Sequence, residues 1–322
     1  MATYVNIINC GTSVLNTGVT NCSYDPANFE GVILLPKGKT LTKSEVAAIN
    51  ATLTALIAND NKALRAYPIQ RFEGCELKNT ESTYRESGYG VSSKTRQGKY
   101  GFVFEYRDGA TGLHKQLSSF DGLQGDFDVV FMDAKNNGLA GMSKDGVTFK
   151  GFTLDRIDIP NVMFNNGTDP TLYHIDLGLA YPKEVNNYIS FIPMPDDIDV
   201  MDYVGLQNIN MVVDTELAAV TAGTLNLKFM AGGVDLYDTY NGQIDTASLY
   251  TFTNAQTGAA ITVTSVTAVP ATKSFEVLLD VLDADYPAIG GRVKAYFGDV
   301  SDIATAGMVG FGEAIAYSTR IA

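Results

Sequence analysis

The stretch Lys99-Tyr-Gly-Phe-Val-Phe-Glu-Tyr-Arg-Asp-Gly109 decides the fold class. Its aromatic side chains fall on alternate positions from Tyr100 to Tyr106, with smaller or charged residues between them. Successive side chains of a β-strand point to opposite faces, so this period of two predicts a half-buried strand. Asp108-Gly109 is a turn signal, and residues 113–117 are expected to return as the partner strand.

The sequence before this strand predicts a buried strand and one prominent helix. Residues 31–35 form an apolar run that ends at Pro36, which is typical of a buried strand. Thr42-x-x-Glu45 matches a capping box, in which each side chain satisfies a free amide at a helix start. An apolar stripe at spacings of three and four then predicts a helix over 43–65 that packs on a sheet: Val46, Ile49, Leu53, Leu56, Ile57 and Leu64. The polar, glycine-punctuated residues 79–94 are interpreted as a long loop.

The first 30 residues have no periodic element. They do contain apolar side chains that need burial, namely Val5, Ile7, Ile8, Val14 and Leu15. We therefore expect residues 1–30 to form an arm that contacts a neighbouring subunit.

The rest of the chain reads mainly as strands and turns. Further strands are predicted at 69–72, 127–132, 147–154, 157–164 and 172–179, with a strand or a short helix over 183–191. Residues 193–203 hold two prolines and four acids and are interpreted as a linker. Seven strands without a helix then follow at regular spacing: 206–213, 224–230, 248–253, 260–266, 274–282, 291–297 and 313–320.

These patterns predict a mainly β protein. The arm over 1–30 is followed by a β-rich sandwich or barrel domain with one prominent helix over 31–203. An immunoglobulin-like β-sandwich over 204–322 completes the chain, although it lacks tryptophan and the paired cysteines of antibody domains.

Composition limits the classes of function. The net charge of −13 argues against a general nucleic-acid binder, which needs a basic surface to displace counterions from phosphates. The sequence contains no run of about 18 apolar residues, so no membrane span is predicted. The N-terminus lacks the pattern of a signal peptide. Synthesis in the cytoplasm is therefore expected.

No motif for catalysis or cofactor binding stands out. A nucleophile elbow, a phosphate-binding loop and a zinc-protease helix are all missing from the sequence. His114 and His174 could serve as metal ligands or as a base, but structural histidines are the favoured interpretation. Ser143-Lys144-Asp145 has the residue types of a catalytic group, yet the neighbouring glycines favour a turn.

Three further groups of residues are weighed against structural roles. Two acidic groups offer hard oxygen ligands for calcium but lack the spacing of an EF-hand, so solvated loops are favoured: Asp196, Asp197, Asp199 and Asp202, and Asp280, Asp283 and Asp285. Asn166-Gly-Thr168 fits a glycosylation sequon but is interpreted as a turn. The cysteines Cys10, Cys22 and Cys75 are expected to be reduced, and we predict no catalytic, cofactor-binding or metal site.

Several stretches are similar to a family of structural proteins from phages of gut and aquatic bacteria. They are Leu34-Leu-Pro-Lys-Gly38, Tyr67-Pro-Ile-Gln-Arg-Phe72, Glu86-Ser-Gly-Tyr-Gly90, Gln97-Gly-Lys-Tyr-Gly-Phe102 and Asp145-Gly-Val-Thr-Phe-Lys-Gly-Phe152. The similarity covers roughly residues 30–190. The whole-chain plan also resembles the major tail tube proteins of long-tailed phages, some of which carry an immunoglobulin-like domain outside the tube.

This resemblance implies a non-enzymatic virion protein that self-assembles, with a tail tube subunit as the narrower expectation. Its partners would be copies of itself and other virion proteins, without cofactors, specific nucleic-acid binding or membrane contact, and its location would be the virion. Alternatives are a capsid shell or decoration protein, including a double jelly-roll capsid protein. A carbohydrate-binding or adhesive module is a rival class.

The tube interpretation carries an expectation about charge. Carboxylates lining the lumen would repel passing phosphates, with Glu105, Asp126 and Asp128 as candidates. The alternative is that these acids face solvent outside the particle and confer solubility. A lumen lined instead by Lys99, Arg107 and Lys115 would contradict the tube mechanism.

Overall fold

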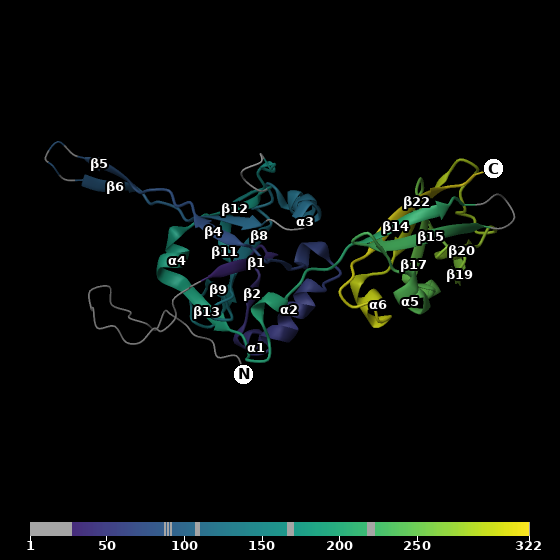
Figure 1. The fold of residues 1–322 in the computed structure, drawn as a ribbon, viewed down its shortest axis with the longest axis horizontal. Coiled ribbons are helices and arrows are strands. Elements are labelled where there is room, and N and C mark those ends of the chain that lie inside the picture. Colours follow the sequence, from purple (N-terminus) through teal and green to yellow (C-terminus); the bar gives the residue numbers. More distant parts are fainter. Residues whose placement is uncertain are drawn as a thin grey trace. The chain divides into compact units, whose positions relative to one another are not determined.

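The computed structural model describes residues 28–86, 88, 90, 92–106, 110–165, 171–217 and 223–321 (Figure 1). The chain divides into two compact units: unit 1 contains residues up to Ile57 and from Asn61 to Gly205, and unit 2 contains Ala58–Asp60 and residues from Leu206. The division therefore falls two residues after the expected boundary at 203/204. Most of the expected arm over 1–30 lies outside the described residues, and Phe29 and Glu30 already belong to the first strand.

Unit 1 consists of one large antiparallel sheet, a separate hairpin and short helices. Its strands are β1 (Phe29–Pro36), β2 (Thr40–Leu41), β3 (Tyr67–Gln70), β4 (Gly74–Leu77), β5 (Thr83–Glu86), β6 (Ser92–Arg96), β7 (Gly101–Tyr106), β8 (Phe127–Asp133), β9 (Gly138–Met142), β10 (Phe149–Lys150), β11 (Phe152–Asp158), β12 (Tyr173–Leu179) and β13 (Ile189–Pro193). The main path through the large sheet is β2-β10-β9-β8-β11-β12-β7-β4, with β1 paired to both β8 and β3, and β13 paired to β9.

Strands β1 and β8 are buried on both faces, which explains their continuous apolar sequences. On one face, Phe131 of β8 packs against Phe102 of β7, with ring centroids 4.7 Å apart. The predicted aromatic strand is present as β7, and its phenylalanines lie in the main core of unit 1. The prediction that it is only half-buried is wrong, because the residues between the aromatics, such as Val103, are also buried.

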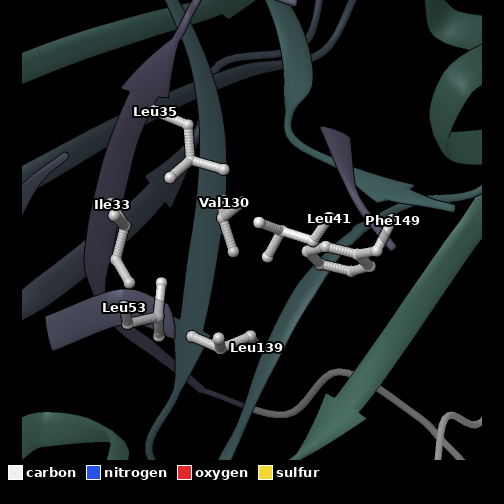
Figure 2. Close-up of a pocket in the computed structure, with 7 residues that line it drawn as sticks. All are labelled: Ile33, Leu35, Leu41, Leu53, Val130, Leu139 and Phe149. Atoms are coloured by element: carbon white, nitrogen blue, oxygen red, sulfur yellow. The ribbon is translucent and has the colours of Figure 1, made fainter. Parts of the chain in front are cut away.

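The other face of β1 and β8 is covered by helix α2 (Ile49–Ile57). Figure 2 shows Leu53 of this helix beside Ile33 of β1, with Val130 of β8 and Leu35 further along the same face. The remaining lining residues are Leu41, Leu139 and Phe149, and the space between the seven side chains has no room for a water molecule. This is a dry second core and not a ligand cavity.

The predicted single helix over 43–65 is wrong in its length. The capping box at Thr42 and Glu45 is present and starts α1 (Lys43–Ala47), but the backbone leaves helical geometry at Ala48 before α2 begins. After α2, the short 3-10 helix η2 (Lys62–Leu64) starts separately, capped by the side chain of Asn61. Asparagine and aspartate favour caps and turns over helix interiors, which accounts for the break at residues 58–61.

The expected partner strand over 113–117 is a helix, α3 (Ala110–Leu117). Strand β7 already pairs with β4 on one edge and β12 on the other, so no edge was left for a third partner. The turn expected at Asp108-Gly109 lies outside the described residues. The segment over 183–191 contains both alternatives, because α4 (Pro182–Tyr188) leads directly into β13. The prediction of a linker over 193–203 is wrong, because this segment is part of unit 1. It contains the short helix η4 (Val200–Asp202), and the side chains of Val200 and Tyr203 are buried.

Unit 2 is a sandwich of two antiparallel sheets. Its strands are β14 (Ile209–Thr215), β15 (Thr224–Ala231), β16 (Val234–Asp235), β17 (Tyr250–Asn254), β18 (Ala260–Ile261), β19 (Val263–Val269), β20 (Ser274–Leu279), β21 (Arg292–Phe297) and β22 (Ala314–Thr319). One sheet has the order β14-β15-β20-β19 and the other the order β18-β17-β21-β22. These orders match the A-B-E-D and C′-C-F-G arrangement of immunoglobulin domains.

The chain is mainly β, as predicted, and each of the seven expected C-terminal segments overlaps a strand. The prediction that this region lacks helices is wrong, since α5 (Tyr237–Ile244) and α6 (Val300–Thr305) lie in the connections. Phe229 and Phe297 hold the two sheets together, with ring centroids 4.8 Å apart. No disulfide or tryptophan is needed for this core.

Candidate functional site

The segment predicted as a loop over 79–94 belongs to a long hairpin, which we define as residues 74–106. At its root, β4 pairs with β7 from Gly74 opposite Glu105 to Leu77 opposite Phe102. Backbone hydrogen bonds continue the pairing outward, and β5 then pairs with β6. In Figure 1, β5 and β6 extend away from the other labelled elements of unit 1.

The two ends of this hairpin differ in burial. Every residue of β7 is buried or half-buried, whereas every residue of β5 and β6 is exposed. The outer end, which we call the tip, therefore has no packed face among the described residues. A two-stranded hairpin on its own is only marginally stable in water, so the tip is a surface suited to a partner.

Three polar side chains fix the direction of the hairpin between root and tip. Asn79 Oδ1 accepts from the backbone N–H of Gly101 at 3.2 Å, and Thr80 Oγ1 accepts from that of Lys99 at 2.8 Å. Ser82 Oγ accepts from the N–H of Gly98 at 3.0 Å. These residues also line an open polar hollow of about 170 Å³, but their side-chain oxygens are already used to hold the hairpin.

The charge of the tip is opposite to that of the whole chain. Its strands carry Arg85, Lys94 and Arg96 against a single acid, Glu86, while the protein has a net charge of −13. Across the strands, Lys94 lies opposite Tyr84, whose side chain is well exposed. The sequence did not predict this site because the tip has no alternating apolar residues. Only its threonine and tyrosine residues, which are common in strands, could have indicated strands.

The two histidines do not form one site. His114 lies on α3, where Nδ1 is 3.4 Å from the phenol oxygen of Tyr106 and the ring packs near Tyr173. His174 on β12 lies beside Glu105, with 3.6 Å between Nε2 and Oε1. Each histidine has its own neighbours, which suits the structural interpretation.

Ser143, Lys144 and Asp145 form a turn, as expected. The carboxylate of Asp145 accepts from the backbone N–H groups of Val147 and Thr148, and these bonds lower its pKa to about 2. Ser143 Oγ accepts from the N–H of Gly146 at 3.0 Å. The side chains therefore organise the turn and are not arranged around an open cleft.

The acidic groups also have local roles. Asp199 caps η4, and Asp283 accepts from the backbone N–H groups of Thr262 and Asp285, which lowers its pKa. In the described part of the chain, no three His, Cys, Asp or Glu side chains come together as metal ligands. Desolvation raises the pKa of the Cys75 thiol to about 11, while Cys10, Cys22 and Asn166-Gly-Thr168 lie outside the described residues.

The three acids proposed to line a lumen differ in their exposure to solvent, and the prediction is wrong for one of them. Asp128 is completely buried, where Lys37 Nζ approaches Oδ1 at 2.9 Å and Lys150 Nζ lies 3.5 Å from Oδ2. It therefore cannot line a channel. Glu105 is half-buried beside His174, and Asp126 is exposed.

The three basic residues whose presence in a lumen would contradict the tube mechanism do not form a group among the described residues. Lys99 pairs with Asp155, Lys115 is exposed on α3, and Arg107 lies outside the described residues. This arrangement does not make a basic channel within one subunit.

Among the described residues, no helix combines the length and apolar character needed to cross a membrane. No protein-family model, curated protein or solved structure matches this chain.

Proposed function

We propose that the protein is a non-enzymatic structural subunit of a phage virion that assembles with copies of itself, most specifically a tail tube subunit. The other expected partners are further virion proteins, and the expected location is the virion. The resemblance in residues 30–190 motivates the phage assignment. The tip of the long hairpin supports assembly.

The tip supports self-assembly because it offers a surface and a charge that the rest of the subunit can complement. Both of its faces are exposed, and its hydrogen-bonded base holds it in one direction. Arg85, Lys94 and Arg96 would be attracted to the acidic surface of a second copy. The docking of the tip would bury strands that are marginal on their own.

A capsid shell or decoration protein remains the alternative. The double jelly-roll version loses support, because the two units differ in strand order and unit 2 has the order of immunoglobulin domains. Tail tube is favoured by the plan of a β-rich unit followed by such a sandwich. Neither assignment requires catalytic chemistry.

The experiment is to compare the full chain with a variant that lacks only the tip. In this variant, residues 81–98 are replaced by the two-residue turn Asn-Gly, which connects Thr80 to Lys99. These two residues already lie opposite each other, because the N–H of Thr80 donates to the carbonyl of Lys99 at 2.9 Å. Light scattering and negative-stain microscopy should show rings, tubes or shells for the full chain, and only monomers for the variant. Its circular dichroism and cooperative melting should be retained.

Charge variants test the role of the basic tip. Changing Arg85, Lys94 and Arg96 to glutamine should weaken assembly, and the effect should be larger at low salt. The matched control changes three exposed lysines elsewhere in unit 1, Lys43, Lys135 and Lys183, to glutamine. A full chain that stays monomeric at high concentration, or a tip-less variant that assembles normally, would contradict the proposal.

A further inference from the structure

The outer face of the β18-β17-β21-β22 sheet in unit 2 carries a compact group of basic, aromatic and hydroxyl side chains. In β21 and β22, inward residues are buried and alternate residues face outward. Lys294 lies opposite Tyr317 on β22 and Thr253 on β17, and Arg292 lies opposite Thr319. We call these five residues the tyrosine patch.

Within the described residues, the two cations of the patch have no acidic partner, unlike the other two lysines of unit 2. Lys228 pairs with Asp214, and Lys273 pairs with Asp238. Arg320 donates to the carbonyl of Pro287 and lies over the ring of Tyr286. Among the described residues, Arg292 and Lys294 contact no carboxylate, although residues 206–322 contain twelve acids and only five bases.

The position of these two cations points to an anionic ligand. Residues two apart on a strand project from the same face and lie roughly 7 Å apart, so Arg292 and Lys294 can reach neighbouring acidic groups of one molecule. Arginine binds a carboxylate through two parallel N–H donors. In a domain with a large excess of acids, this is a local reversal of charge.

The aromatic and hydroxyl groups narrow the ligand to a sugar acid. Tyr317 is 49% exposed, and the guanidinium of Arg292 lies over its ring, 5.1 Å from the centroid. An aromatic ring packs well against the apolar C–H face of a pyranose, and the hydroxyls of Thr253 and Thr319 can bond sugar hydroxyls. Protein interfaces are depleted of lysine but enriched in arginine and tyrosine, so an acidic protein is the competing partner that the test must distinguish.

The opposite end of the same face is acidic, which limits where an anion can bind. The phenol of Tyr296 donates to Asp299 at 2.7 Å. Burial, this hydrogen bond and the nearby charges of Asp299, Glu313 and Asp60 together raise the pKa of Tyr296. An anionic polymer would therefore be held at the Arg292 end and repelled beyond Tyr296. At about 0.15 M salt, charges are screened over about 8 Å, so direct contacts at the patch can outweigh the repulsion from the acidic chain.

We propose that the tyrosine patch binds a carboxylated polysaccharide, with Arg292 and Lys294 on its carboxylates and Tyr317 against a sugar ring. This function goes beyond assembly of the particle and does not depend on it.

The test measures depletion of the full-length protein by beads carrying polygalacturonate at about 0.15 M salt. This assay works for single subunits and for assembled particles, so it is independent of the proposed function. Binding should be strong on polygalacturonate and lost on neutral dextran. Arg292→Gln with Lys294→Gln should weaken it about tenfold or more, Tyr317→Ala should weaken it, and Arg292→Lys with Lys294→Arg should retain most of it.

Two controls distinguish recognition of a sugar acid from attraction by charge alone. The variant Lys228→Gln with Lys273→Gln changes the net charge by the same amount as Arg292→Gln with Lys294→Gln. It removes two lysines that already pair with acids, so it should bind like the natural chain. Beads carrying polyglutamate test charge without sugar. No depletion by polygalacturonate, equal depletion by polyglutamate, or equal loss in the control variant would each overturn the proposal; the polyglutamate result would instead indicate an acidic protein partner.

Discussion

At the scale of the residue, the buried carboxylate of Asp128 determines how the turn after β1 is held. Lys37 in the turn and Lys150 on β10 approach it, and the backbone N–H of Gly38 donates to Oδ2 at 2.9 Å. A buried charge is costly unless it is paired and hydrogen-bonded. Here both oxygens lie near a lysine and Oδ2 accepts a hydrogen bond, while Oδ1 is held by the ion pair with Lys37 alone. The contribution of Asp128 is therefore to stability and not to a channel surface.

We expect Asp128→Asn to lower the free energy of unfolding by about 2–3 kcal/mol, because it removes the charge that both lysines face while they remain partly solvated. Urea unfolding followed by circular dichroism measures this difference. The control Asp126→Asn lies two residues away on an exposed side chain and should change stability by less than about 0.5 kcal/mol. Equal effects of the two substitutions would refute the role assigned to Asp128.

At the scale of the element, some predictions held because local pattern and tertiary contacts agree. The alternation in β7 and the capping box at Thr42 and Glu45 specify their elements directly, and the box lowers the pKa of Glu45 to about 2, chiefly through the N–H of Thr42. Other elements depend on partners far away in sequence. Residues 113–117 became helical because β4 and β12 occupy both edges of β7, and no pattern within those residues shows this.

The candidate site was the least predictable part of the chain for the same reason. The tip has no apolar face, so its strands follow from the register of the root and from the bonds of Asn79, Thr80 and Ser82. The tyrosine patch combines residues from three strands, so it can be predicted only when the order of the strands in the sheet is known. Hydrophobic periodicity specifies what is buried and leaves such exposed surfaces undetermined.

The base of the hairpin offers a test of whether its direction matters. A Cβ at Gly98 would lie 2.1 Å from the carbonyl oxygen of Thr80, so Gly98→Ala must displace the backbone there. We expect this variant to melt cooperatively but to assemble poorly, because the tip is aimed differently. Gly88→Ala is the control, since its Cβ would meet no atom within 4 Å, and it should assemble like the natural chain. Light scattering over a concentration series compares the variants, and normal assembly of Gly98→Ala would show that the tip needs no fixed direction.

At the scale of the whole molecule, the two units have separate cores. The buried cluster of unit 1 joins β1, β7, β8, β11 and β12, and that of unit 2 joins its two sheets with α5 and α6. The two proposed functions also belong to different units. The tip, proposed for assembly, is in unit 1, and the tyrosine patch, proposed for polysaccharide binding, is in unit 2. A chain organised in this way can assemble through one unit and bind through the other.

This division predicts that unit 2 is dispensable for assembly. A chain that ends at Gly205 keeps the complete large sheet, the long hairpin and the whole core of unit 1. It also loses residues 206–322, which carry a net charge of −7, so repulsion between assembled copies should fall. We expect the shortened chain to form particles with the same subunit repeat as the full chain, measured by averaging of electron micrographs, and to lose depletion by polygalacturonate beads. Failure of the shortened chain to assemble while it still melts cooperatively would place an essential subunit contact in unit 2 and contradict the division.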